Sequence, residues 1–208
     1  MADKPFQPPK LFFLMENELL FVCLGDSLTA GSPGFSGYGL WRGDITSQYG
    51  YWLDLQVKTG FPEIAAEFLN YGVGGNVVRQ MIDRYTREVL FQLDHVDYVL
   101  VMGGNNDVVW HGATPEETLR DLEELFNLIT NSGAKPIGLE ILPVTTDQAL
   151  VDGIKETNRG LFDLGERLNV PVVALYDALS DESGNGLAAE YDSGDGEHLS
   201  VAGYRKVG

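Results

Sequence analysis

The alternation of short apolar segments with segments of helical periodicity constrains the fold of this chain more than any other feature. A continuous apolar run that ends in glycine, such as LLFVCLG, predicts a strand buried on both faces of a sheet. Strands that alternate with helices favour parallel pairing with right-handed crossovers. The pattern therefore predicts an α/β fold, a three-layer α/β/α sandwich around a mainly parallel five-stranded sheet. The predicted strands are Leu19–Gly25, Ala66–Gly72, Val96–Gly103, Lys135–Leu142 and Pro171–Tyr176.

The clearest helix signal lies at Thr114–Asn131. Thr114 reads as an N-cap, Pro115 as the first helical residue and Glu117 as the partner in a capping box. An apolar stripe follows, made of Leu119, Leu122, Leu125, Phe126 and Ile129. Further helices are expected at Tyr51–Lys58, Val77–Gln92 and Gln148–Leu168.

The 208 residues predict one domain spanning 1–208, because the chain contains no repeat, low-complexity run or linker. Ser32–Gly50 is rich in Gly, Tyr and Trp, and we interpret it as a long surface loop. Ser200–Tyr204 begins to look helical shortly before the sequence stops at Gly208. Either the terminal helix is short or the sequence is truncated there.

The net charge of the chain limits the classes of partner that it is expected to bind. Lys and Arg number 14 against 31 Asp and Glu, which gives a formal net charge of -17. We expect such a chain to bind nucleic acid or an anionic membrane poorly, because proteins bind both through Lys and Arg. No integral membrane segment is expected, and Glu16 and Glu18 interrupt the apolar run Leu11–Met15, which argues against a signal peptide. We expect a cytoplasmic protein, with a secreted form already stripped of its signal as the alternative.

The single cysteine, Cys23, cannot form an intramolecular disulfide and lies within the first predicted strand, where a packed, inert thiol is expected. His95 precedes the third strand and is interpreted as a surface or edge residue. Neither residue is assigned to a functional site.

Polar and glycine-rich segments follow the first three predicted strands, and another lies near the C-terminus. In parallel α/β sheets, ligands bind at the carboxyl ends of the strands. A hydroxyl, a glycine turn, an amide and an Asp/His pair would then converge on one edge, and acyl transfer needs these groups as nucleophile, oxyanion donors, base and orienting carboxylate. The segments are Gly25–Gly31 (GDSLTAG), Gly72–Asn76 (GVGGN), Gly103–Asp107 (GGNND) and Asp195–Ser200 (DGEHLS).

In order and spacing these four segments resemble the blocks of the SGNH hydrolases, also called GDSL esterases and lipases. GDSL contains the nucleophile serine, GVGGN the glycine block, GNND the GxND block and DGEH the DxxH block. The resemblance covers nearly the whole chain and implies the flavodoxin-like fold of that family. It also implies a serine esterase or lipase that cleaves carboxylic esters without cofactor or metal.

The resemblance assigns roles to individual residues. Ser27 would attack the acyl carbon, His198 would act as general base and Asp195 would orient the imidazole. The oxyanion hole would consist of the backbone N–H groups of Ser27 and Gly75 and the side-chain amide of Asn106. Asn105 is the alternative to Asn106, because GGNN could align with the same block. We favour Asn106 because Asp107 then fills the final position of the block.

Other interpretations of the same residues remain to be weighed. The glycine loop fails as a dinucleotide fingerprint because Val77 occupies the position of the third glycine, and no G-x-S-x-G is present. Asp192–Glu197 lacks a ligand required of a calcium loop, so no metal site is predicted. Trp110 and His111 are further candidates for lining the substrate pocket.

Three alternatives to a carboxylic ester hydrolase remain open. A thioesterase or an acyltransferase would use the same Ser-His-Asp site, since one acyl-enzyme can serve several acceptors. A catalytically silent module that binds a carbohydrate or a partner is disfavoured, because Ser27 and His198 are both present. A small-molecule ester is the expected substrate, while its acyl and alcohol groups and the oligomeric state do not follow from the sequence.

Overall fold

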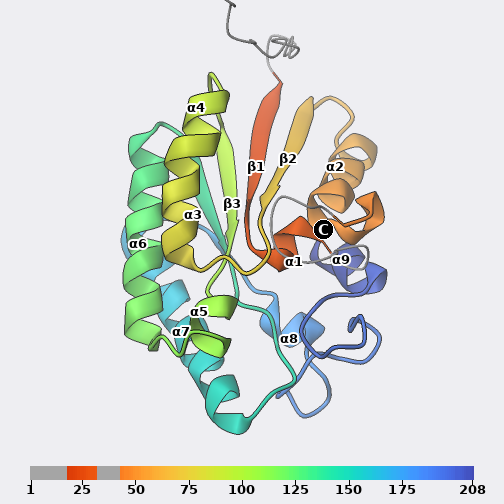
Figure 1. Ribbon diagram of the computed structural model, residues 1–208. Coiled ribbons are helices and arrows are strands. Elements are labelled where there is room, and N and C mark those ends of the chain that lie inside the picture. Colours follow the sequence, from red (N-terminus) through yellow and green to blue (C-terminus); the bar gives the residue numbers. More distant parts are fainter. Residues whose placement is uncertain (1–17, 32–42) are drawn as a thin grey trace, which may run out of the picture.

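The computed structural model describes residues 18–31 and 43–208, and their central element is a parallel sheet of five strands (Figure 1). The strand order is β2-β1-β3-β4-β5, and each neighbouring pair is parallel. The predicted α/β architecture is confirmed. The strands are β1 (Leu19–Gly25), β2 (Ala66–Gly72), β3 (Tyr98–Met102), β4 (Lys135–Leu139) and β5 (Val172–Val173).

The strands β3, β4 and β5 are shorter than the sequence predicts at 96–103, 135–142 and 171–176. After β4, the backbone N–H of Ile141 donates to Asn158 Oδ1 and its carbonyl accepts from Asn158 Nδ2, so a side chain replaces the strand partner. After β5, the N–H groups of Leu175 and Tyr176 donate to the Glu140 carboxylate. Apolar burial therefore continues directly past the end of β4, whereas after β5 it resumes at Leu175.

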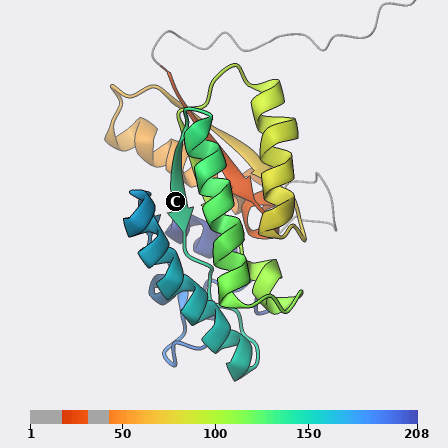
Figure 2. The same cartoon turned by 90° about the vertical axis from the view of Figure 1, so that its left-hand side faces the viewer.

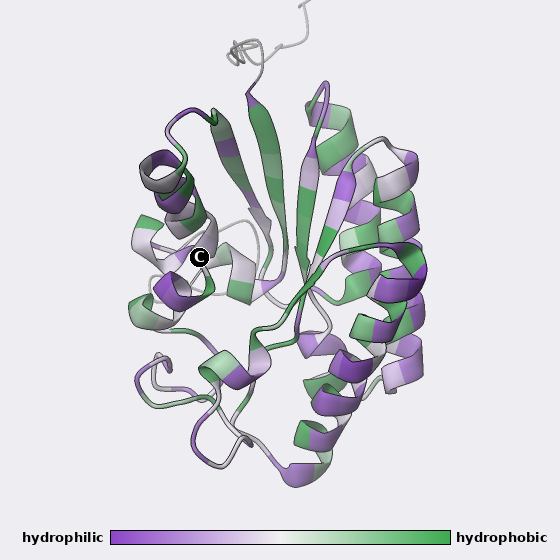
Figure 3. Ribbon diagram, turned by 180° about the vertical axis from the view of Figure 1, so that it is seen from behind, coloured by the Kyte–Doolittle hydropathy of each residue, from purple (hydrophilic) through white to green (hydrophobic). Residues whose placement is uncertain are grey.

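Helices cover both faces of the sheet. One face packs against α3 (Val78–Arg84), α6 (Pro115–Asn131) and α7 (Gln148–Leu168), and Figure 2 shows α6 and α7 lying side by side. The other face packs against α2 (Tyr49–Gly60), α8 (Tyr176–Leu179) and α9 (Val201–Val207). Figure 3 shows mostly hydrophobic strands between helices that are banded with hydrophilic residues, as expected of a sheet buried on both faces.

Local signals set the helix starts. Thr114 Oγ1 accepts from the backbone N–H of Glu117, and Glu117 Oε2 accepts from that of Thr114, so the predicted capping box is present. Asp147 caps α7 in the same way by accepting from Leu150 N. The helix predicted at Val77–Gln92 consists instead of α3, a π-helical turn over Tyr85–Val89 and α4 (Leu90–Gln92).

Helices occupy the end of the expected loop and the C-terminal segment, and α2 (Tyr49–Gly60) is longer than the helix predicted at Tyr51–Lys58. Residues 32–42 of the loop expected at Ser32–Gly50 lie outside the described residues, and the rest of it holds a 3-10 helix (Ile45–Ser47) and the start of α2. The segment that begins to look helical at Ser200 forms α9, with Ser200 Oγ accepting from Gly203 N. Within residues 18–31 and 43–208, no helix combines the length and apolarity needed to cross a bilayer.

Candidate active site

The candidate nucleophile lies at the carboxyl end of the central strand β1. Gly25, its last residue, pairs with Gly72 of β2 and Met102 of β3. A Cβ at Gly25 would lie 2.5 Å from the Met102 carbonyl oxygen, so the close approach of these strands requires glycine. Asp26 then caps the short helix α1 (Ser27–Ala30), which places the Ser27 hydroxyl at the edge of the sheet.

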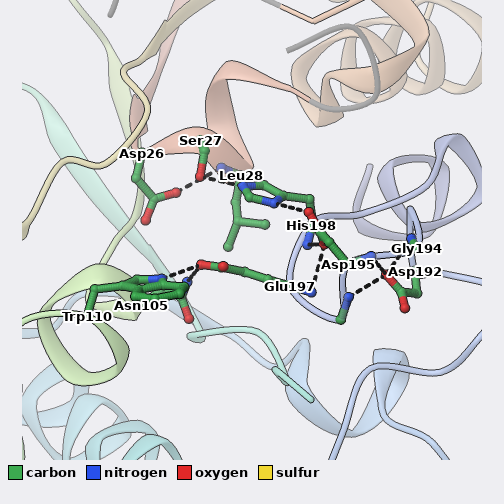
Figure 4. A network of polar contacts seen from close by, with 11 residues as sticks. Asp26, Ser27, Leu28, Asn105, Trp110, Asp192, Gly194, Asp195, Glu197 and His198 are labelled. Atoms are coloured by element: carbon green, nitrogen blue, oxygen red, sulfur yellow. Dashed lines mark hydrogen bonds and ion pairs between the residues drawn. The ribbon is translucent and has the colours of Figure 1, made fainter. Parts of the chain in front are cut away.

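A chain of hydrogen bonds joins Ser27, His198 and Asp195 (Figure 4). Ser27 Oγ lies 2.9 Å from His198 Nε2, and His198 Nδ1 lies 2.8 Å from Asp195 Oδ2. Because a carboxylate only accepts, Nδ1 carries the proton and Nε2 is left to accept from the serine hydroxyl. The structure therefore brings together residues 171 positions apart in the arrangement that activates a serine.

The loop that holds His198 is shaped by two of its own carboxylates. Asp195 Oδ1 accepts from the backbone N–H groups of Glu197 and His198 at 3.0 and 2.8 Å. Asp192 Oδ1 accepts from those of Gly194, Asp195 and Gly196. Burial opposes ionisation of Asp195, but the hydrogen bonds from the His198 and Glu197 backbone and from the imidazole lower its pKa below the usual value. Asp195 is thus held as an anion beside the imidazole.

The candidate oxyanion donors lie around Ser27. Within the described part of the chain, no acceptor is found for the backbone N–H of Ser27 or of Gly75, so both donors are available. Gly75 has φ of 78°, a conformation that favours glycine. Asn106 Nδ2 donates to the Asn76 carbonyl at 3.0 Å and to Asp26 Oδ2 at 3.2 Å, which directs the amide towards the nucleophile segment.

Asp26 lies fully buried behind the nucleophile. Its Oδ1 accepts from Leu28 N at 2.9 Å while Oδ2 faces the Asn106 amide. Burial raises the pKa of Asp26 to about 7, and the negative charges of Glu197 and Asp107 contribute to the increase. The hydrogen bond from Leu28 and the charge of His198 oppose it. The carboxyl therefore titrates near neutral pH.

The structure separates the two adjacent asparagines. The Asn106 amide donates to Asp26, the neighbour of Ser27, whereas Asn105 Nδ2 donates to Glu197 Oε1 at 2.7 Å. Trp110 and His111 are both exposed beyond α5 (Asn105–Val109), and only Trp110 is tied to the His198 loop, through its indole N–H on Glu197 at 3.0 Å.

The two residues assigned to no site behave as expected. His95 is exposed beside Asp97, with Nε2 3.3 Å from the carboxylate. Cys23 is buried, and burial raises the pKa of its thiol to about 12, which leaves it protonated at neutral pH.

Arg84 supports the site in a way that sequence reasoning missed. Its guanidinium donates to the Tyr71 carbonyl at 2.5 Å and to Asn76 Oδ1 at 2.9 Å, and it lies 3.4 Å from the Gly25 carbonyl. It therefore joins the ends of β1 and β2 to the glycine loop.

A family model described as the GDSL-like Lipase/Acylhydrolase family matches residues 23–206. No curated protein sequence is matched.

Solved structures of similar fold come from several bacteria. A putative lipolytic protein of the G-D-S-L family from Desulfitobacterium hafniense superposes with a TM-score of 0.72 at 21% identity, over 91% of this chain and 95% of that one. A variant of an acetyl xylan esterase from Geobacillus stearothermophilus gives 0.68 at 23%, over 92% and 94%. A lipase/acylhydrolase from Enterococcus faecalis gives 0.66 at 25%, over 89% of each chain.

Proposed function

Because the chain belongs to the GDSL-like Lipase/Acylhydrolase family, we propose that it is a serine esterase that cleaves carboxylic esters through an acyl intermediate on Ser27. The observation that carries the proposal is the hydrogen-bond chain from Ser27 Oγ through His198 to Asp195, with distances of 2.9 and 2.8 Å. A small-molecule ester is the proposed substrate.

The first half-reaction forms the acyl-enzyme. Ser27 Oγ attacks the carbonyl carbon of the ester while its proton moves to His198 Nε2, and the carbonyl oxygen becomes an oxyanion. The N–H groups of Ser27 and Gly75 and the Asn106 amide would stabilise that charge. A donor of this kind typically contributes about 2.7–4 kcal/mol to the transition state. The C–O bond to the alcohol then breaks, and the alcohol leaves with the proton from His198.

The second half-reaction releases the acid. His198 takes a proton from water, the hydroxide attacks the acyl carbon, and the Ser27 ester bond breaks. Ser27 Oγ recovers its proton from His198, so the enzyme returns to its starting state. The Asp195 carboxylate stabilises the imidazolium in both halves.

The substitution Ser27→Ala tests the proposal. It should lower kcat for nitrophenyl acetate by a factor on the order of 10⁴ or more, since the residues of such a triad act as a unit. Ser193→Ala, which removes an exposed hydroxyl from the loop that precedes His198, is the matched control and should retain activity. A serine-reactive phosphonate should label the native protein at Ser27 and leave Ser27→Ala unlabelled. Full activity in Ser27→Ala would refute the mechanism.

A further inference from the structure

Glu197 is a carboxylate within the DGEH segment to which the proposed reaction assigns no role. It lies between Asp195 and His198, and its Oε1 accepts two hydrogen bonds from the other side of the site (Figure 4). One comes from Asn105 Nδ2 at 2.7 Å and the other from Trp110 Nε1 at 3.0 Å. Glu197 thus joins the loop of the candidate base to α5, which holds the candidate oxyanion residue Asn106.

The bond to Asn105 is the stronger constraint. Asn105 is 2% exposed, and its Oδ1 is buried without a partner among the described residues, so the hydrogen bond from Nδ2 to Glu197 is the contact that holds this buried amide. The carboxylate also determines the orientation of that amide, because the flipped form would place Oδ1 against a negative oxygen. Removal of the carboxylate would leave a buried donor unpaired.

The remaining hydrogen bonds of the loop explain why such a connection matters. Asp192 and Asp195 form hydrogen bonds within the loop, so they determine its shape and not its place against the sheet. The Gly196 carbonyl accepts from Thr145 N at 2.7 Å, which fixes one point beyond β4. The contact from Glu197 to α5 fixes a second point, directly beside His198.

We propose that Glu197 is a positioning residue. Its hydrogen bond from α5 fixes the loop, and so holds His198 at the distance from Ser27 and Asn106 that the reaction needs. This inference rests on the proposed function. Catalytic groups must be held to within a fraction of an ångström, and a displacement of about 1 Å can cost about 100-fold in rate. Loss of the hydrogen bonds to Glu197 should therefore lower kcat and leave KM nearly unchanged, because Glu197 acts through His198 and not through the substrate.

The test compares Glu197→Ala, Glu197→Gln and Asn105→Ala with a small nitrophenyl ester. We expect Glu197→Ala to lower kcat by about 10- to 100-fold with KM within about twofold. Glu197→Gln keeps an acceptor oxygen for both donors and should recover most of the lost rate. Asn105→Ala should behave like Glu197→Ala, and the double variant should be little worse than either, because both remove the same contact. Glu182→Ala, an exposed glutamate with the same charge change, is the control.

Trp110→Phe keeps the test decisive even if Glu197→Ala does not fold. Trp110 is 66% exposed, so the substitution removes one donor without opening a buried site, and we expect a loss of about threefold in kcat. Unchanged kcat in Glu197→Ala would overturn the positioning role of Glu197, and so would unchanged kcat in Trp110→Phe if only that variant folds. Equal losses in Glu197→Ala and Glu197→Gln, or independent losses in Glu197→Ala and Asn105→Ala, would also overturn it. Activity retained in Ser27→Ala would instead refute the proposed function itself, so the two failures are distinguishable.

Discussion

The two sides of the candidate site are built by different means. Ser27 is 6% exposed, and Asp26 beside it is fully buried, at the end of a strand paired on both sides. On the other side the His198 and Asp195 side chains are 19% and 53% exposed, in a loop shaped by carboxylate-to-backbone hydrogen bonds. The nucleophile is therefore held at the core of the fold, whereas the base lies in an exposed loop that is shaped by its own hydrogen bonds and joined to the rest of the fold through Thr145 and Asn105.

This contrast predicts that substitutions on the two sides differ in how they affect activity and the free energy of unfolding. On the buried side a substitution should change activity and the free energy of unfolding together, because the same groups belong to the core. On the loop side it should change activity alone. The three substitutions below test this separation in order of decreasing expected effect.

The largest effect is expected for Asp195→Asn. The new amide would face His198 Nδ1 with a donor and favour the wrong imidazole tautomer, which costs about 10⁴-fold in a comparable triad. We expect kcat/KM to fall by about 10³- to 10⁴-fold, with the melting temperature changed by no more than about 3 °C because the side chain is exposed. Steady-state kinetics and thermal unfolding on one preparation measure both. A large drop in melting temperature would contradict the separation.

Sequence patterns predicted residues on both sides of the site, and they predicted the first strands better than the last two. Apolar runs ending in glycine located β1, β2 and β3, and the segments that follow them contain Ser27, Gly75 and Asn106. The ends of β4 and β5 were predicted too far along the chain, at Leu142 and Tyr176. The backbone N–H groups there donate to the side chains of Asn158 and Glu140 and not to a neighbouring strand.

The missed residues share a physical reason. The hydrogen-bond partners of Glu197, Asn105 in α5 and Trp110 directly after it, lie 92 and 87 positions away in the sequence. Arg84 reaches back 59 positions to the Gly25 carbonyl. No local pattern encodes such contacts. The contacts of Asp192 are local, but the segment Asp192–Glu197 resembles an incomplete calcium loop, and the role of Asp192 as a backbone acceptor emerges only from the folded loop.

Asp26 should make stability depend on pH on the buried side. Its pKa is raised from 3.8 to about 7, so the folded protein binds the proton more tightly than the unfolded chain does. The free energy of unfolding should therefore fall as pH rises from about 4 to 7 and level off above that. Because one pKa unit corresponds to about 1.4 kcal/mol, the full change attributable to Asp26 is at most about 4 kcal/mol.

Asp26→Asn isolates this contribution. Urea unfolding of both proteins from pH 4 to 8 should show the native protein losing stability relative to the variant across that window. The variant also places an amide against Asn106 Nδ2, but that cost does not change with pH. Asp195 makes the free energy of unfolding change with pH in the opposite direction. Because its pKa is lowered in the folded protein, its contribution to stability is present above pH 4 and lost as pH falls further. Parallel curves for native protein and Asp26→Asn would contradict the assignment.

The smallest effect is expected for Asp192→Ala on the loop side. The substitution removes the acceptor for three backbone N–H groups, those of Gly194, Asp195 and Gly196, so the loop should sample other conformations. We expect kcat to fall by about 10-fold, equivalent to about 1.4 kcal/mol, and the free energy of unfolding to change by less than about 1 kcal/mol. Asp192→Asn retains an oxygen and should recover most of the rate.

Asp181→Ala is the matched control for that experiment. Asp181 Oδ1 accepts from the backbone N–H groups of Ser183 and Asn185 in a turn of the same kind, but that turn contains none of the proposed catalytic residues. If the activity loss comes from displacing His198, Asp192→Ala should lower kcat while Asp181→Ala leaves it unchanged, although each removes one loop carboxylate. Equal kinetics in the two variants would mean that the base does not depend on the shape of its own loop. The contrast between a nucleophile held at the core and a base held by the shape of an exposed loop would then fail.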